Sequence, residues 1–434
     1  MKCSIVIAGL SLLFFNYVFS SSCYWNKVNP YKLFSTKTPY NNGRGDIRDS
    51  AKLEDCDAIS IWGLFRHGQR NPGIKYSENI EHVIDIRKDL IKRHKEGKGS
   101  LCVQDVENLA DWKVNPRMFT DLHDTTEEGL YEMHGIAKRL KEAYKNLIGD
   151  LQPETYTFRS SFQPYIRLCI DSFLEGLGQP DLKVDEIRRR DIMSAFDDCK
   201  RYKKFVKHNQ TTFFLAYEYQ TSAEYLKSKE NVQKRIGINY ELTNEEFISL
   251  YDLCRYTWSA VDDKPSPWCA LFDKEDLKIQ EYYEDLRLYY RNGYGNPWNI
   301  EFGRIPLADL LKTFQLEKEK PRKKITAYFS HATMLSMTYS ALGLFKDDKP
   351  LTPYNRDDHR KWRTSEHALF GGSLIAVLNK CNKKAPDDFV VAFYMNEKPL
   401  KELCNHGICT WDEFQEMLRP SKNKTFENVC YMKM

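Results

Sequence analysis

Three short apolar runs constrain the fold of this chain more than any other feature. They are rich in β-branched and aromatic residues, and they lie at 58–65, 325–329 and 389–394, with 373–378 as a further candidate. Such runs are typical of buried β-strands. Amphipathic helical patterns lie between them, and one begins at 125–128 (TTEE), which has the form of a capping box. Strands that alternate with helices predict an α/β fold with a central, mostly parallel sheet flanked by helices.

The middle of the chain has a different pattern. Helical patterns with charged faces dominate there, as in 221–233 and 275–290. We therefore expect an inserted, mainly helical subdomain at 172–299. An α/β core would then be formed by 23–171 together with 300–434. The length of 434 residues is enough for a core of this size.

The first 22 residues have the composition of a signal peptide. Lys2 precedes an apolar run at 5–19, and three serines at 20–22 form a cleavage region. The alternative is a membrane anchor, but the run is shorter than the roughly 20 residues that span a bilayer. The last four residues, YMKM, are not an ER-retention signal. We expect a secreted protein with no transmembrane span once residues 1–22 are removed.

The cysteines and the net charge of the chain indicate its compartment and the kinds of partner it can have. Twelve cysteines fit an oxidising compartment, and removal of Cys3 with the signal would leave an odd number. The chain has neither a CxxC nor an HExxH motif, so the spacing does not support a metal site. Asn209 and Asn423 begin N-glycosylation sequons. A formal net charge of +4 is too small for this length to indicate a nucleic-acid partner.

The apolar run at 58–65 leads directly into the sequence RHGQRNP at 66–72. In open α/β sheets, ligands bind just beyond the carboxyl ends of the strands. Arg66 and Arg70 flank His67, and guanidinium groups match phosphate oxygens with bidentate geometry. An imidazole among cations stays neutral, which leaves a nitrogen lone pair free to attack phosphorus. The alternative is a solvated basic turn that contains an incidental histidine.

A second histidine stands at a second predicted strand end. His331 follows the run at 325–329 and precedes an apolar helical run at 335–344. Alone it could be a hydrogen-bonded core histidine, but together with His67 it indicates a shared site. Arg167 is a third candidate, although alone it would be read as a surface arginine.

Together these residues resemble the histidine acid phosphatases and, within them, the multiple inositol polyphosphate phosphatases. The similarity extends over nearly the whole chain after residue 22. The RHGQRNP sequence matches the family signature RHGxRxP. The other segments that carry the resemblance are TKTPY at 36–40, RLCIDS at 167–172, EYYEDL at 281–286, GYGN at 293–296 and NEKPL at 396–400.

The resemblance implies a histidine acid phosphatase-like fold and a role for each residue. His67 would be the catalytic nucleophile and form a phosphohistidine. Arg66, Arg70, Arg167 and the catalytic His331 would hold the phosphate and stabilise charge in the transition state. No metal or organic cofactor is implied. The substrates would be highly phosphorylated inositols, with 2,3-bisphosphoglycerate as another.

The resemblance also implies a set of disulfides. The cysteine spacing of the family leaves Cys23, Cys102 and Cys169 unassigned. The implied pairs are Cys56–Cys381, Cys199–Cys430, Cys254–Cys269 and Cys404–Cys409.

One departure from the family concerns the catalytic acid. This branch has Ala-Glu after the second histidine, and that carboxyl group protonates the leaving alkoxide. Here Thr333 stands in place of the glutamate, and a hydroxyl group is far too weak an acid to replace it. General acid catalysis contributes roughly 10²–10⁴-fold, so we expect slower formation of the phosphoenzyme. Glu366, His359 and His367 are candidates to substitute.

Two further positions depart from the family. An ungapped match of the segment after Arg167 puts Tyr165 where the third arginine belongs. Two residues along a helix are more than half a turn, so Arg167 could point elsewhere. Ser373 stands where the branch has asparagine.

Three functional hypotheses remain at this stage. The first is a secreted phosphomonoesterase that acts on inositol polyphosphates, slowed by Thr333. The second is a secreted protein that uses the same basic pocket to bind an anionic phosphorylated ligand without catalysis. The third is another histidine phosphatase, such as a general acid phosphatase, against which the TKTPY and NEKPL segments argue. Release of phosphate would separate the first two, and a substrate panel would separate the first from the third.

Overall fold

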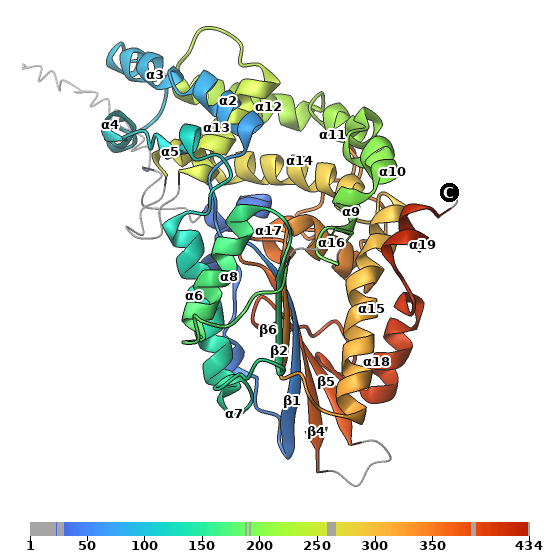
Figure 1. The fold of residues 1–434 in the computed structure, drawn as a ribbon. Helices are drawn as coiled ribbons and strands as arrows, with labels where there is room; N and C mark the ends of the chain where they lie inside the picture. The colour runs from blue at the N-terminus through green and yellow to red at the C-terminus, as the bar shows by residue number, and fades with distance from the viewer. Residues whose placement is uncertain are drawn as a thin grey trace, which may run out of the picture.

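The computed structural model describes residues 23, 30–186, 189–190, 192–257, 266–382 and 388–432. The predicted signal peptide at 1–22 lies outside this part of the chain. A seven-stranded sheet forms the centre of the molecule (Figure 1), with strand order β2-β3-β1-β4-β5-β6 and with β7 paired to β5. The strands are β1 (Cys56–Arg66), β2 (Tyr156–Ser160), β3 (Ile325–Ser330), β4 (Ser373–Cys381), β5 (Phe389–Met395), β6 (Lys398–Pro399) and β7 (Ile408–Thr410).

The α/β class is confirmed, but the sheet is mixed rather than mostly parallel. The strands β2, β3 and β1 form parallel ladders. The strand β4 is antiparallel to both β1 and β5, and β6 and β7 add to β5 in the antiparallel sense. Only residues 382–388 separate β4 from β5 in the sequence. A parallel pair needs a crossover of a dozen residues or more, so this connection permits only an antiparallel pair.

Helices cover both faces of the sheet. Ile61 and Phe65 of β1 belong to one hydrophobic cluster, and Trp62 and Leu64 belong to another. Burial on both sides explains why the run at 58–65 is continuously apolar. The helices of the first cluster are α6 (Glu127–Ala143), α7 (Lys145–Ile148) and α8 (Pro164–Gly176). Those of the second are α9 (Ala195–Asp198), α10 (Lys200–Tyr202), α15 (Pro297–Glu319), α16 (Ala332–Ala341), α18 (Trp411–Leu418) and α19 (Phe426–Cys430).

A third hydrophobic cluster is built from helices of two separate parts of the chain, drawn above the sheet in Figure 1. Residues of 74–120 and of 214–292 pack together in it, so no single segment forms this layer. The division into a core and an insert at 172–299 stays a prediction. The elements of this cluster are α2 (Ile74–Val83), α3 (Ile86–Lys95), α4 (Val103–Asp111), α5 (Arg117–Thr120), α11 (Phe214–Tyr219), α12 (Ala223–Ile236), α13 (Asn244–Tyr256), η7 (Pro267–Leu271) and α14 (Lys274–Asn292).

Short helical turns complete the described chain. They include η5, a single π-helical segment, and several 3₁₀ turns. Their bounds are η2 (Pro30–Leu33), η3 (Ser35–Lys37), α1 (Tyr40–Gly43), η4 (Ile47–Asp49), η5 (Lys203–Lys207), η6 (Gln210–Phe213), α17 (Thr364–His367) and η8 (Arg419–Ser421).

The described residues form five disulfides, three of which join positions far apart in the sequence. Four of them are the pairs that the family resemblance implies, Cys56–Cys381, Cys199–Cys430, Cys254–Cys269 and Cys404–Cys409. The fifth joins Cys23 to Cys102, which the sequence left unassigned. Cys169 is buried and makes no disulfide.

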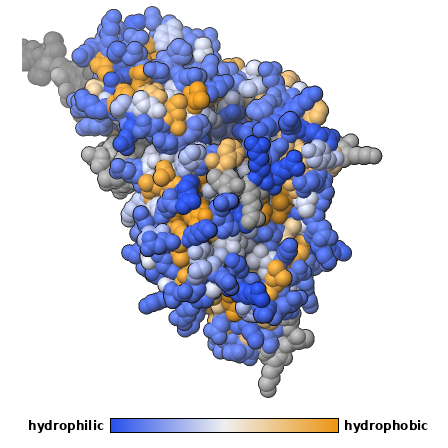
Figure 2. Space-filling view, in the orientation of Figure 1, coloured by the Kyte–Doolittle hydropathy of each residue, from blue (hydrophilic) through white to orange (hydrophobic). Residues whose placement is uncertain are grey.

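The surface has no strongly apolar face in the view of Figure 2. Blue, hydrophilic residues predominate there, with separate orange patches over the helices. Scattered exposed apolar residues are normal for a globular protein. Within the described ranges, no helix is both long enough and apolar enough to cross a bilayer.

Candidate active site

The parallel pairing of β1 with β3 brings two histidines together. Arg66 at the end of β1 lies opposite Ser330 at the end of β3. The next residues along the two strands, His67 and His331, are therefore neighbours, and their ring centroids are 5.7 Å apart. Both line a cavity of about 300 Å³. The carboxyl ends of the parallel strands thus form the floor of the site, as the sequence predicts.

Glycine is required next to His67. A Cβ atom on Gly68 would come within 2.1 Å of the carbonyl oxygen of Gly129, which lies in the first turn of α6. The helix begins at Glu127 with Thr126 as its N-cap, one residue later than the capping box at 125–128 predicts. The RHG turn therefore packs directly against the start of α6, which fixes the backbone at His67.

One hydrogen bond assigns the protonation state of the His67 ring. Its Nδ1 lies 2.8 Å from the carbonyl oxygen of Gly68. A carbonyl oxygen only accepts, so Nδ1 carries the hydrogen and Nε2 carries the free lone pair. Burial lowers the pKa of His67 well below its ordinary value, and the charges of Arg66 and Arg70 lower it further. Such a neutral imidazole can act as a nucleophile on phosphorus.

The two arginines of the signature are held in different ways. Nη1 of Arg66 donates to the carbonyl oxygens of Thr36 (2.5 Å) and Ala368 (2.7 Å), and its guanidinium lies 4.3 Å from the ring centroid of Phe370. Burial and the charge of Arg70 lower the pKa of Arg66 to about 9, so it stays cationic at neutral pH. Nη1 of Arg70 donates to the carbonyl oxygen of Asn71. Both arginines line the cavity as cations.

Cations outnumber anions around the cavity. Two carboxylates line it, Asp197 and Glu284, against a larger set of lysines and arginines. A lining of this sign favours a ligand with several negative charges. The lysines and arginines of the lining are Lys37, Arg66, Arg70, Lys207, Arg287 and Arg291.

Thr333 occupies the expected position of the acid. It is in the first turn of α16 and lines the cavity close to His331. The first turn of α16 contains no acidic residue. A hydroxyl group thus lies in the cavity where the resemblance predicts a carboxyl group.

The three residues considered as substitutes for that acid do not line the cavity. Glu366 forms an ion pair with Arg363, and its side chain is 61% exposed. His367 is buried in a stack with Phe345 (4.9 Å between ring centroids), and burial lowers its pKa to about 3. His359 lines a different cavity. None of the three is placed to protonate a leaving group at His67.

The structure does not bring Arg167 to the cavity. Its side chain lies on the exposed face of α8, where Nε donates to Asp171 (3.0 Å). Tyr165 lines the cavity instead, with its ring centroid 5.3 Å from that of His67 and 5.6 Å from the guanidinium carbon of Arg70. The two positions differ by more than half a helical turn, which directs Arg167 away from the cavity.

A sequence model described as "Histidine phosphatase superfamily (branch 2)" matches residues 60–396. The chain belongs to this family. Its members are hydrolases of phosphoric monoesters, and the chain is a histidine phosphatase of this kind. It is 28% identical over 397 residues to multiple inositol polyphosphate phosphatase 1 of Drosophila melanogaster, covering 88% of this chain and 84% of the relative. The human protein of the same name is 28% identical over 415 residues, with 88% and 82% covered.

Solved structures share the fold at low sequence identity. The phytase from D. castellii superposes with a TM-score of 0.75 at 18% identity, covering 93% of this chain and 88% of the phytase. The multiple inositol polyphosphate phosphatase of Bifidobacterium longum, in a complex with inositol hexasulfate, gives a TM-score of 0.64 at 12% identity, with 85% and 92% covered. The histidine acid phosphatase-like fold is therefore confirmed.

Several residues of this histidine phosphatase site carried no clear signal of their own in the sequence. Lys37 belongs to the TKTPY segment and Glu284 to the EYYEDL segment, so the resemblance marked these regions without assigning their roles. Lys207, Arg287 and Arg291 come from helical segments with many charges, and no local motif separates them from surface residues. Only the three-dimensional packing of 203–292 over the strand ends makes them part of the site.

The described part of the chain holds one group of candidate metal ligands, Cys23, Cys102 and Asp105. The two sulfur atoms form a disulfide, which removes them as metal ligands. This group also lies apart from the residues that line the cavity.

Proposed function

We propose that this chain is a secreted phosphomonoesterase that hydrolyses inositol polyphosphates through a phosphohistidine on His67. The excess of cations around the cavity is the observation that carries this proposal. Six lysine and arginine residues line a space of about 300 Å³ together with two carboxylates. A substrate with one phosphate would leave most of these charges unpaired, whereas a polyphosphorylated ring offers phosphates on several sides. The names of the relatives are in keeping with such a substrate.

The proposed reaction has two steps. In the first, Nε2 of His67 attacks phosphorus, the bond from phosphorus to the ester oxygen breaks, and the inositol oxygen leaves with a proton. In the second, water attacks the phosphohistidine, releases inorganic phosphate and restores the imidazole. Arg66 and Arg70 stabilise the charge on the phosphoryl oxygens in both transition states, and His331 adds a neutral donor. The hydrogen bond from Nδ1 to Gly68 keeps the ring oriented throughout.

The disulfide bonds of the chain support the proposal that it is secreted. Five disulfides are stable in an oxidising compartment and rare in the cytosol. We propose that residues 1–22 are removed as a signal peptide and that Asn209 and Asn423 carry glycans. Asn423 is exposed and Asn209 is partly exposed. N-terminal sequencing of the protein from culture medium tests the cleavage, and the loss of mass on glycosidase treatment tests the glycans.

A second candidate function is a binder of anionic phosphorylated ligands with little or no turnover. Two observations favour it, the hydroxyl of Thr333 at the position of the acid and the phenol of Tyr165 at the position of the third arginine. Neither change reduces the positive charge that Arg70 and Arg287 contribute to the cavity. Binding without release of phosphate would support this candidate.

The deciding experiment follows phosphate release from inositol hexakisphosphate between about pH 4 and 7.5, a range that spans carboxylate and histidine titration. We expect turnover in the unmodified protein, none in His67→Ala, and faster turnover in Thr333→Glu. A general acid contributes about 10²–10⁴-fold, which is the upper limit for that gain. Tight binding without phosphate release in any of the three proteins would contradict a phosphatase and support a binder.

A further inference from the structure

Glu284 is one of two carboxylates among the lysines and arginines of the cavity lining, and its role there is to pair with Arg287. Burial opposes its ionisation, but the charges of Arg255 and Arg287 outweigh burial and lower its pKa to about 2. Its Oε1 accepts from Nη1 of Arg287 at 2.7 Å. Glu284 is therefore a permanent anion that orients Arg287, and it has no proton to give.

Asp197 is the second carboxylate of the cavity lining. It forms an ion pair with Lys207, and its side chain is 13% exposed. Its charge acts on His331 and on Tyr165, both of which line the cavity. The carboxyl group thus lines the same cavity as His331, which stands two residues before Thr333.

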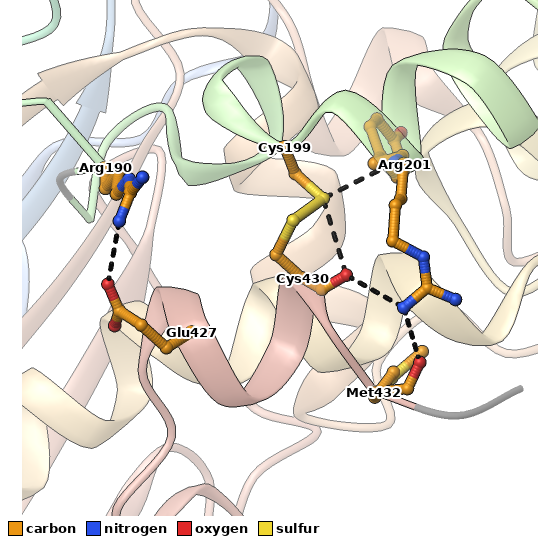
Figure 3. Close-up of a disulfide and its surroundings, with 7 residues drawn as sticks. Arg190, Cys199, Arg201, Glu427, Cys430 and Met432 are labelled. Carbon is orange, nitrogen blue, oxygen red and sulfur yellow. Dashed lines mark hydrogen bonds and ion pairs between the residues drawn. A yellow bond between two sulfur atoms is a disulfide. The ribbon is translucent and has the colours of Figure 1, made fainter.

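A disulfide fixes the short helix that carries Asp197. The helix α9 ends at Asp198, and Cys199 directly after it is bonded to Cys430 of α19 (Figure 3). Nη1 of Arg201 donates to the carbonyl oxygen of Met432 at 3.0 Å on the same side. The segment at 195–201 is therefore attached to the C-terminal part of the molecule, which restricts where Asp197 can move.

We propose that Asp197 donates the proton to the leaving inositol oxygen in place of the carboxyl group that Thr333 lacks. This inference rests on the proposed phosphatase function and names the group that completes it. Among the described residues that line the cavity, Asp197 is the one carboxyl group not committed to holding an arginine. Glu366, His359 and His367 lie outside the lining, so they do not compete for this role.

The proton transfer balances in both steps. As the bond between phosphorus and the ester oxygen breaks, the carboxylic acid of Asp197 gives its proton to that oxygen and becomes a carboxylate. The carboxylate then accepts a proton from the water that attacks the phosphohistidine, which regenerates the acid. One carboxyl group therefore serves as acid and then as base, and no other reactant is needed.

The ion pair with Lys207 does not prevent this role. A phosphate group in the cavity carries more negative charge than a carboxylate, so it competes for the ammonium group of Lys207. Substrate binding therefore frees the carboxyl group of Asp197 from Lys207 within the cavity that both side chains line.

The test compares two leaving groups in Asp197→Asn. An inositol alkoxide needs a proton, whereas p-nitrophenolate leaves without one. We expect kcat/KM for inositol hexakisphosphate to fall by about 10²-fold or more, with kcat/KM for p-nitrophenyl phosphate nearly unchanged. Asp198→Asn is the matched control, because Asp198 is exposed and does not line the cavity. An equal loss on both substrates in a variant that melts like the unmodified protein would overturn the proposal.

A second variant tests the same role of Asp197 independently. Together the variants distinguish a failure of this role from a failure of the proposed phosphatase function. Adding Thr333→Glu to Asp197→Asn restores a carboxyl group at the family position, and we expect it to recover turnover of inositol hexakisphosphate. No recovery in a folded double variant that still cleaves p-nitrophenyl phosphate would count against proton donation by Asp197. If the unmodified protein cleaves neither substrate, the phosphatase function itself is refuted. Activity on both substrates with no selective loss refutes the role of Asp197 alone.

Discussion

A single backbone carbonyl decides which nitrogen of His67 is free to react. The carbonyl oxygen of Gly68 accepts from Nδ1. Burial and two arginines lower the pKa of His67 well below the ordinary value, so the ring stays neutral in acid. We therefore expect the neutral Nδ1–H form of His67 to persist at pH 5, below the ordinary histidine pKa of about 6.5. NMR of the protein with ¹⁵N-labelled histidine, assigned with His67→Ala, measures this directly. A protonated ring at pH 5 would contradict the prediction.

The positions of Arg167 and Arg70 predict unequal losses of kcat/KM when each side chain is removed. Arg167→Ala removes an exposed ion pair with Asp171, so we expect a change of less than about 1 kcal/mol in the free energy of unfolding and little change in kcat/KM. Arg70→Ala removes a cation from the cavity lining, so we expect a large loss of kcat/KM at similar stability. Steady-state kinetics and thermal melting of both variants are sufficient. A large catalytic loss in Arg167→Ala would place that residue back in the site.

Among elements, the N-terminal turn, the RHG turn and α6 meet at one buried side chain. Glu132 of α6 accepts the backbone N–H of Tyr40 (2.8 Å) and of Gln69 (2.9 Å). The hydroxyl of Tyr40 donates to Glu397, which also binds Arg139. The TKTPY and NEKPL segments, at opposite ends of the chain, are thus parts of one support for the active-site turn.

The protonation of Glu132 predicts a pH-dependent stability. Burial raises its pKa from 4.5 to about 7, so the folded protein holds this proton where the unfolded chain has lost it. The contribution of Glu132 to stability therefore falls as the pH rises through that window, by about 3 kcal/mol. Glu132→Gln cannot titrate and lacks this fall. Its amide leaves one backbone N–H without an acceptor, which costs about 1–3 kcal/mol at low pH.

Denaturant unfolding at pH 4.5 and pH 7.5 tests this expectation for Glu132. We expect Glu132→Gln to be less stable than the unmodified protein at pH 4.5 and to lose that disadvantage by pH 7.5. Glu127→Gln on the exposed side of the same helix is the control. A difference between Glu132→Gln and the unmodified protein that does not change with pH would contradict the raised pKa.

How far the sequence predicts these elements depends on how local their signals are. The runs at 58–65 and 325–329 predict strands whose ends carry His67 and His331, so the floor of the site can be predicted from the sequence. The direction of β4 relative to β1 cannot, since an apolar run fits a parallel or an antiparallel strand equally well. The sequence left open whether residue 165 or residue 167 faces the cavity, because a shift of two residues changes the face of a helix that is exposed.

At the scale of the whole molecule, the walls of the site come from segments that are far apart in sequence. Lys37, Asp197, Lys207 and Glu284 reach the cavity from four different elements. No local pattern distinguishes these side chains from solvated charges, and long-range packing alone selects them. The same packing explains why the resemblance covers segments near both ends of the chain, since TKTPY supports Arg66 and NEKPL supports Tyr40.

The disulfides are the whole-molecule feature that holds these distant segments together, and their separations predict unequal effects. Cys199–Cys430 spans 231 residues and fixes the helix of Asp197, whereas Cys404–Cys409 spans 5. In the chain-entropy model, the longer closure stabilises the fold by about 3 kcal/mol more than the shorter one, before other cross-links are counted. We therefore expect Cys199→Ser/Cys430→Ser to lower the free energy of unfolding more than Cys404→Ser/Cys409→Ser. Denaturant unfolding of the two double variants measures the difference. Equal losses would mean that local packing, rather than closure of the chain, sets the contribution of these bonds.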